Sequence, residues 1–128
     1  MGLRDQLRIM VVDDMSTSRG LITQALDAMG IAQVGYASDG PGALAAIAKS
    51  PVHLVISDYN MPGMDGLQLL HALRTDARTK GVGFILITGR ADKEIIDNGR
   101  KLGMNNFLKK PFEPQNLRTC IEAVVGRL

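Results

Sequence analysis

Five short apolar runs, each followed by a segment with helical periodicity, restrict this chain to few folds. The clearest run lies within residues 52–57, where Leu54, Val55 and Ile56 are too few for an isolated helix and are typical of a strand buried on both faces. We expect the other strands over residues 9–12, 31–37, 84–87 and 105–109. Strands that alternate with helices indicate an α/β domain, with a five-stranded parallel sheet and helices on both of its faces.

Helical segments are indicated by apolar residues that recur every three or four positions. After the first strand, Ser16, Thr17 and Ser18 offer hydroxyl groups for capping a helix. The buried face of this helix is expected to consist of Leu21, Ile22, Ala25, Leu26 and Met29, and Gly30 is expected to end it. Further helices are predicted after Asp39, after Asp65, over residues 92–102 and through Leu117 to Val125.

Length and composition are those of a soluble protein with one domain. We expect residues 1–128 to form a single unit with no output domain attached. Hydrophobic residues make up 45% of the chain, and no apolar run approaches the roughly 20 residues that cross a membrane. Residues 1–8 lack the apolar core of a secretion signal, so a cytoplasmic location without membrane insertion is expected. A net charge of +2 gives no reason to expect a nucleic-acid partner.

Three residues of kinds that often bind metals are expected to have no such role. Cys120 is the only cysteine, so neither an internal disulfide nor a cysteine metal site is expected. It falls among apolar residues at helical spacing and is interpreted as core filler, with a reactive thiol as the lesser alternative. His53 and His71 have no acidic or cysteine neighbours at ligand spacing.

Acidic, hydroxyl and basic side chains follow the predicted strands at the points where these strands end. Because the carboxyl ends of parallel strands meet at one edge of a sheet, these side chains are expected to share a rim. Two carboxylates about 4 Å apart repel by roughly 4 kcal/mol at an effective dielectric constant near 20. Three of them therefore favour a bound cation, and magnesium suits oxygen ligands best. The residues concerned are Asp13, Asp14, Asp58, Thr88 and Lys110.

Each member of this rim also has an ordinary structural interpretation. Asp13 and Asp14 could cap the following helix, and only their combination with Asp58 favours a metal site. Lys110 could be a solvated surface lysine, but its long stem suits pairing with a phosphoryl oxygen, and Pro111 constrains the bond that follows it. Thr88 could be a plain strand-end residue or donate a hydrogen bond to the same phosphoryl group. We interpret Asp58 as the phosphate acceptor of a magnesium-dependent switch.

Five separated motifs together resemble the signature of response-regulator receiver domains. They are Asp13-Asp14, the stretch from Ser57 to Pro62, Met64-Asp65-Gly66, Thr88-Gly89 and Lys110-Pro111-Phe112. The resemblance covers essentially the whole chain and is closest to the single-domain CheY-like chemotaxis type. It implies a flavodoxin-like receiver fold, with the parallel strands in the order 2-1-3-4-5.

The resemblance also implies a chemical role for the rim residues. Asp58 would accept a phosphoryl group from the phosphohistidine of a histidine kinase, CheA-like in chemotaxis systems. Asp14, Asp58 and the backbone carbonyl of Asn60 would ligate Mg2+, and Asp13 would contribute through water. Such a protein is a phosphoacceptor that assists its own phosphorylation and dephosphorylation, and it is not counted as an enzyme.

Further residues are assigned to switching and tuning on the same resemblance. Thr88 and Lys110 would hold the phosphoryl oxygens, with a cis bond between Lys110 and Pro111. Phe107 would turn inward as Thr88 moves toward the phosphate, and a static core residue is the alternative for this aromatic ring. Asn60 and Arg90 occupy positions that tune phosphate lifetime, although Arg90 could equally be an ordinary exposed arginine.

Several functions remain open at this stage. The phosphorylated protein could bind the flagellar motor switch protein or drain phosphate from a shared kinase. A magnesium-dependent phosphatase with an aspartyl nucleophile is an alternative, but Asn60 stands where such enzymes usually place a second acid. A degenerate receiver acting as an unphosphorylated interaction module is a third, and the complete rim argues against it.

The C-terminal half of the chain has a basic bias. This is interpreted as a solvated surface, with an acidic partner or a cyclic dinucleotide as the lesser alternative. The weak G-x-G-x-x-A match at residues 40–45 is interpreted as a plain helix start. The basic residues concerned are Arg90, Lys93, Arg100, Lys101, Lys109, Arg118 and Arg127.

Overall fold

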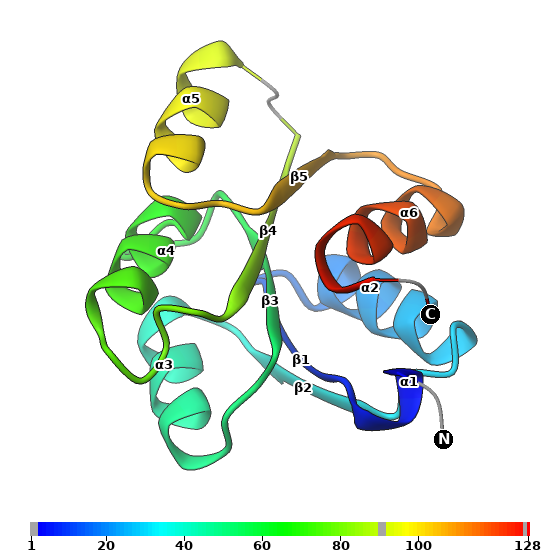
Figure 1. Cartoon of the computed structure of the whole chain (residues 1–128). Coiled ribbons are helices and arrows are strands. Elements are labelled where there is room, and N and C mark those ends of the chain that lie inside the picture. Colours follow the sequence, from blue (N-terminus) through cyan, green and yellow to red (C-terminus); the bar gives the residue numbers. More distant parts are fainter. Residues whose placement is uncertain (1–2, 90–91, 127) are drawn as a thin grey trace.

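The computed structural model describes residues 3–89, 92–126 and 128, and Arg90 and Arg127 therefore lie outside the described residues. Within them, strands and helices alternate as predicted (Figure 1). The strands are β1 (Arg8–Val12), β2 (Gln33–Ala37), β3 (Leu54–Asp58), β4 (Gly83–Thr88) and β5 (Asn106–Lys109). The helices are α1 (Leu3–Gln6), α2 (Ser16–Ala28), α3 (Gly40–Lys49), α4 (Gly66–Thr75), α5 (Lys93–Lys101) and α6 (Pro114–Val125).

All strand pairs are parallel, and the sheet order is β2-β1-β3-β4-β5, which confirms the predicted fold class and order. Helices α2 and α6 cover one face of the sheet, and α3, α4 and α5 cover the other (Figure 1). Along β1, Ile9 and Val11 pack toward the first pair, whereas Met10 and Val12 pack toward the second group. Successive side chains of a strand point to opposite faces, so covering both faces requires an unbroken apolar run.

Helix starts follow from side chains that accept hydrogen bonds from free backbone N–H groups. Asp39 accepts from the Gly42 N–H at 2.7 Å, and Asp92 accepts from the Ile95 N–H at 2.9 Å. Asp65 forms a full capping box with Gln68 at the start of α4. Each such cap contributes about 1 kcal/mol to helix stability. These caps fix where α3, α4 and α5 begin, as the sequence predicts for Asp39 and Asp65.

The start of α2 differs from the prediction. The cap position is Met15, which offers no side-chain acceptor, and the serine and threonine hydroxyls of residues 16–18 lie inside the first turn. The Met15 N–H is instead bound by Asp13 Oδ1 at 3.0 Å. The cap residue of α2 thus makes no side-chain hydrogen bond to the helix, and Asp13 binds the N–H of that residue.

Leu21 is a second correction, because it was expected in the buried face of α2 but is 62% exposed. Ile22 and Leu26 of the same helix are 1% and 0% exposed. These two face the sheet, whereas Leu21 is rotated by about 100° from Ile22 and points toward the connection between β5 and α6. That connection does not cover it.

Smaller differences concern the ends of the elements. Residues 31–32 and 52–53 precede β2 and β3 rather than belonging to them, and Asp58 is the last residue of β3. Asn105 lies just before β5, where its Oδ1 accepts from the Phe84 N–H at 2.8 Å. Helix α1 was not predicted. None of the helices in the described part of the chain is both long and apolar enough to cross a membrane.

Cys120 is buried on the inner face of α6, as expected for core filler. Its Sγ lies 3.6 Å from the backbone oxygen of Phe107. Burial raises the pKa of its thiol to about 11. A thiol with so high a pKa carries little thiolate at neutral pH, and thiolate is the reactive form.

Candidate functional site

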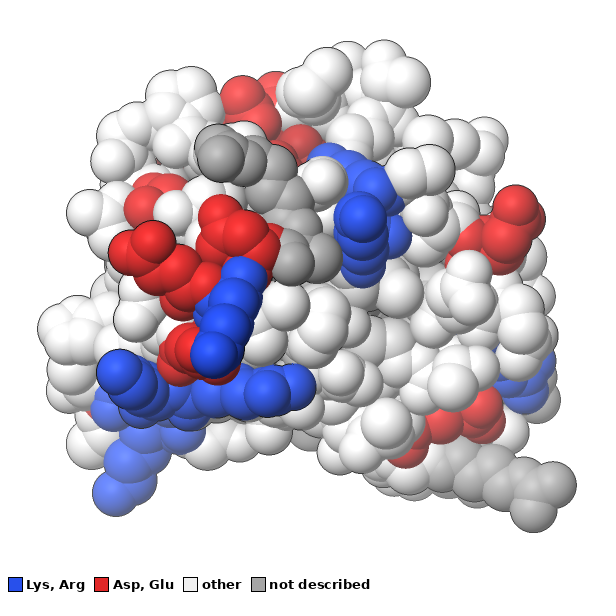
Figure 2. Space-filling view, turned by 90° about the horizontal axis from the view of Figure 1, so that it is seen from above, with Lys and Arg blue, Asp and Glu red and all other residues white. Residues whose placement is uncertain are grey.

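The carboxyl ends of β1, β3, β4 and β5 bring polar side chains together on one face of the molecule. The register pairs Val12 with Ser57 across β1 and β3, and Thr88 with Lys109 across β4 and β5. Figure 2 looks down on the molecule from above and shows acidic side chains gathered beside basic ones on this face. Parallel strands that end at one edge thus assemble the predicted rim.

Asp58 is the centre of this site. Its residue is 7% exposed, and one of its carboxylate oxygens, Oδ1, lies 3.2 Å from the Lys110 ammonium. Burial raises the pKa of Asp58 above its usual 3.8, the Lys110 charge opposes this rise, and the neighbouring Asp13 adds to it. Burial penalises an unneutralised carboxylate, so the site favours a further positive charge.

Two more carboxylates complete an acidic cluster. Oxygens of Asp13, Asp14 and Asp58 all lie within 4.8 Å of one another. Asp13 is fully buried and Asp14 is exposed, so the cluster opens to solvent on one side. Oxygen donors in this number suit a hard divalent cation that keeps part of its water shell. The donor set therefore fits the magnesium that the sequence predicts.

Lys110 reaches into the cluster from the end of β5. The Lys110–Pro111 peptide bond is cis, as the resemblance implies, and the Lys110 backbone N–H donates to the Thr88 carbonyl at 2.9 Å. Its ammonium contacts Asp58 Oδ1 at 3.2 Å, Asp13 Oδ2 at 3.5 Å and Ser18 Oγ at 2.8 Å. Lys110 is therefore no solvated surface lysine. Ser18 was missed as a site residue, since a single serine near a helix start carries no distinguishing pattern.

Gly66 places the start of α4 directly against the acceptor strand. A Cβ atom at this position would lie 2.6 Å from the backbone oxygen of Asp58, too close for any other residue without movement of the backbone. The Gly66 N–H also donates to the Tyr59 carbonyl at 2.9 Å. This contact explains why the chain has glycine after the Asp65 cap.

The remaining predicted residues have different outcomes. Thr88 is 1% exposed at the end of β4, which brings it to the rim. Asn60 lies exposed in the loop that follows β3. Phe107 is half-buried on β5, with the Arg100 guanidinium carbon 6.0 Å from its ring centroid. Arg90 lies outside the described residues.

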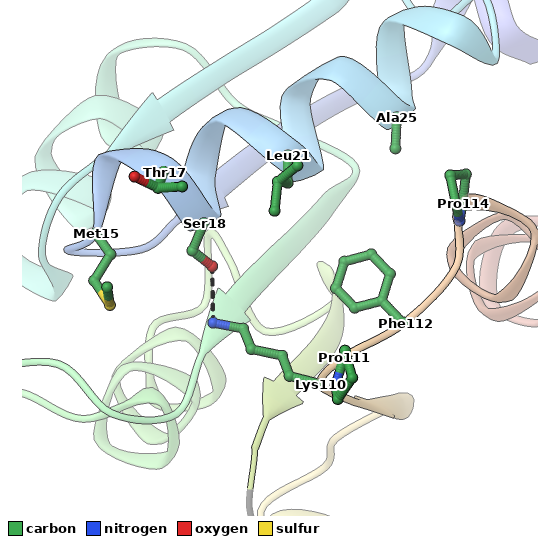
Figure 3. A pocket seen from close by; sticks show the side chains of 9 residues that line it. All are labelled: Met15, Thr17, Ser18, Leu21, Ala25, Lys110, Pro111, Phe112 and Pro114. Atoms are coloured by element: carbon green, nitrogen blue, oxygen red, sulfur yellow. Dashed lines mark hydrogen bonds between the residues drawn. The ribbon is translucent and has the colours of Figure 1, made fainter.

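A groove runs beside the acidic cluster between α2 and the connection that leads into α6. It has a volume of about 560 Å³, and its walls are mostly apolar. Figure 3 shows the Phe112 ring facing α2, with the Lys110 stem along the wall and its ammonium bonded to Ser18. The exposed Leu21 belongs to this groove. The lining residues are Met15, Thr17, Ser18, Leu21, Ala25, Lys110, Pro111, Phe112 and Pro114.

A doubly wound parallel sheet with three acids, a lysine and a threonine at its carboxyl edge defines a signalling domain of the receiver class. Comparison with known sequences agrees. Residues 9–122 match the response regulator receiver domain family, and the chain belongs to this family.

The relatives include chemotaxis proteins that align with this chain over nearly their whole length. The chain is 41% identical over 128 residues to a probable chemotaxis protein CheY of Rhizobium etli, covering 100% of this chain and 99% of the relative. It is 34% identical over 122 residues to the chemotaxis protein CheY of Pseudomonas aeruginosa, covering 95% and 98%. Among solved structures, the chemotaxis protein CheY4 of Vibrio cholerae matches with a TM-score of 0.87 at 30% identity, covering 92% of this chain and 98% of that one.

Proposed function

We propose that this protein is a phosphorylation-dependent switch of a two-component system, which accepts a phosphoryl group on Asp58 and acts in chemotaxis or motility. The observation that carries this proposal is the position of Asp58, a buried carboxylate 3.2 Å from Lys110 and grouped with two other acids. Membership of the receiver family and the similarity to chemotaxis proteins support it.

The chemistry is a transfer between two acceptors. The Asp58 carboxylate attacks phosphorus, so that an oxygen–phosphorus bond forms while the phosphorus–nitrogen bond of a kinase phosphohistidine breaks. The imidazole leaves with the bonding electron pair and takes up a proton from water. Lys110, 3.2 Å from Asp58 Oδ1, would neutralise charge on the phosphoryl oxygens, and Thr88, buried at the end of β4, would donate a hydrogen bond to them.

Asp14, Asp58 and the Asn60 carbonyl are proposed to hold Mg2+, with Asp13 acting through water. When bound, the ion would offset the negative charges that meet as the phosphoryl group approaches the acids. Lys110 does part of this work without the ion, because its ammonium lies 3.2 Å from Asp58 Oδ1 and 3.5 Å from Asp13 Oδ2.

Phe107 and Thr88 are proposed to carry the signal away from the site. Moving an equilibrium from 1:99 to 99:1 requires about 5.5 kcal/mol of differential stabilisation. Hydrogen bonds to a charged group contribute roughly 1.5–3 kcal/mol each, so bonds from Lys110 and Thr88 to a phosphoryl group reach that order. The Phe107 ring is half-buried on β5, next to the strand that ends at Thr88. Asn60 and Arg90 are proposed to set the lifetime of the phosphorylated state.

The proposed partners are a CheA-like histidine kinase and, for the phosphorylated form, the flagellar motor switch protein. A phosphate sink would need only the kinase. A pull-down with the motor switch protein, with and without phosphorylation, separates the two roles, because only the first predicts phosphorylation-dependent capture.

Phosphotransfer from a kinase tests the proposal. A CheA-like kinase is labelled with radioactive ATP, separated from nucleotide and mixed with this protein and magnesium. We expect the label to move to the wild type and to stay on the kinase with Asp58→Asn. Label that never leaves the kinase, or that reaches both variants equally, would contradict the proposal.

A further inference from the structure

The Lys110 ammonium lies among three acceptors that come from three separate elements. Asp58 ends β3, Asp13 follows β1, and Ser18 lies in the first turn of α2. The ammonium carries three N–H donors, and the contacts to these residues measure 3.2, 3.5 and 2.8 Å. The shortest is the hydrogen bond to Ser18, so the uncharged partner holds the ammonium more closely than either carboxylate.

We propose that Ser18 is a positioning residue for phosphoryl transfer, whose hydroxyl holds the Lys110 ammonium at the edge of the acidic cluster. This inference rests on the proposed phosphorylation of Asp58. A lysine side chain has a flexible stem of four carbon atoms and loses much conformational freedom when its end is fixed. An anchor that fixes it before the reaction removes that cost from the reaction itself.

The hydroxyl of Ser18 is suited to this role because it carries no charge. When Asp58 becomes phosphorylated, the ammonium must leave the Asp58 oxygen for a phosphoryl oxygen nearby. A third carboxylate at position 18 would compete with the phosphoryl group for the positive charge. The serine oxygen accepts one N–H from Lys110 and leaves the other donors available, and its own O–H remains able to donate.

The surroundings of the bond favour its persistence. Ser18 is half-buried, and the Lys110 side chain is 26% exposed. The Lys110 stem runs along the apolar groove, and the bond joins this stem to α2 (Figure 3). Arg19, the next residue of α2, donates to the Asp13 carbonyl at 2.9 Å and so fixes the same turn to the end of β1. Ser18 therefore sits on a turn that is itself tied to the site.

The test measures the rate of phosphorylation by acetyl phosphate with magnesium, using intact-protein mass spectrometry. Ser18→Ala is expected to slow the reaction at least roughly tenfold, the lower end of the range for one lost hydrogen bond to a charged group. Ser18→Thr, which keeps the hydroxyl, is expected to restore most of the rate. Ser16→Ala makes the same chemical change at an exposed position of the same turn and is expected to match the wild type.

A double-mutant cycle shows whether Ser18 acts through Lys110. In a Lys110→Ala background, adding Ser18→Ala is expected to change the rate no further, because the group that it positions is gone. A Ser18→Ala protein that reacts at the wild-type rate, or an effect that persists undiminished without Lys110, would overturn the inference. A wild type that takes up no phosphoryl group would instead contradict the proposed function.

A measurement without phosphorylation keeps the two proposals separate. Nitrogen-15 spectra of the lysine ammonium groups are expected to show a Lys110 signal protected from exchange in the wild type and in Ser18→Thr. The protection is expected to be lost in Ser18→Ala. Equal protection in Ser18→Ala would overturn the anchoring role, whatever the phosphorylation assay shows.

Discussion

Lys110 and Arg74 are half-buried cations at opposite ends of the sheet, and the groups that they contact differ in kind. Lys110 meets two carboxylates and a hydroxyl at the carboxyl ends of the strands. Arg74, on α4, donates to the carbonyls of Val82 at 2.6 Å, of Lys80 at 3.0 Å and of Gly103 at 3.0 Å, near the amino ends of β4 and β5. It also donates to the side chain of Asn105.

This difference indicates that Arg74 is a structural cation, which holds the fold, and that Lys110 is a chemical cation, which acts at the site. Backbone carbonyls are neutral and fixed in place, so the Arg74 network has one stable arrangement and only holds loops together. Carboxylates can bind a metal or accept a phosphoryl group, and each event changes what Lys110 is paired with. Burial lowers the pKa of Arg74, whereas at Asp58 burial raises the pKa against the opposing charge of Lys110.

The largest expected effect comes from removing the chemical cation. Lys110→Ala should slow phosphorylation of Asp58 by acetyl phosphate about a hundredfold or more, as the loss of a preorganised charged donor does at other sites. The rate is followed by mass spectrometry with magnesium present. Arg74→Ala serves as the matched control, and its folded protein should react at nearly the wild-type rate. Equal losses in both variants would erase the distinction between the two cations.

Magnesium should stabilise the folded protein by binding to the acidic cluster at the carboxyl ends of the strands. Binding to the folded state alone raises the free energy of unfolding by about 2.7 kcal/mol at a hundred times the dissociation constant. Urea unfolding with and without magnesium measures this gain. Asp14→Asn should lose most of it, whereas Arg74→Ala should keep it in full. A gain that survives Asp14→Asn would place the ion elsewhere.

Removing the structural cation should cost stability rather than reactivity. Arg74→Ala removes the guanidinium donor from three backbone carbonyls, while the Asn105 oxygen keeps its hydrogen bond from the Phe84 N–H. We expect a loss of about 2 kcal/mol in the free energy of unfolding. Urea unfolding at neutral pH checks this value. Arg78→Ala, which removes an exposed arginine paired with Asp76, is the control and should cost far less. Similar losses in Arg74→Ala and Arg78→Ala would contradict the structural role of Arg74.

The smallest expected effect is a pH dependence of the stability, with opposite signs for Asp58 and Asp76. The folded pKa of Asp58 lies above its usual 3.8, so folding takes up a proton between those values and stability falls as pH rises through that window. Without magnesium, Asp58→Asn should therefore raise the melting temperature by a few degrees at neutral pH. The gain should shrink once the pH falls below the window.

Asp76 provides the contrast, because its hydrogen bonds to Arg78 lower its pKa. Its small contribution is present above the usual carboxyl pKa and is lost as pH falls through the lowered value. Asp76→Asn should therefore slightly lower the melting temperature at neutral pH. Melting curves of both variants from acid to neutral pH decide the matter, and slopes of the same sign would contradict this account.

The sequence predicts the fold and the rim well because both depend on patterns. Apolar runs and helical spacing reveal the alternating elements, and residues such as Asp58 and Lys110 are placed by the strands that precede them. The roles of Ser18 and Arg74 depend instead on contacts made by one long side chain that crosses the fold, Lys110 in the first case and Arg74 itself in the second. No local sequence pattern marks such contacts. Leu21 was placed in the core because spacing alone does not show which flank of a helix a neighbouring loop leaves open.

The most direct test of the central claim is the mass of the protein after treatment with acetyl phosphate and magnesium, followed by mapping of the modified residue. We expect the mass of one added phosphoryl group on Asp58, and no addition to Asp58→Asn. An unchanged wild-type mass, or a phosphoryl group mapped to another residue, would contradict it.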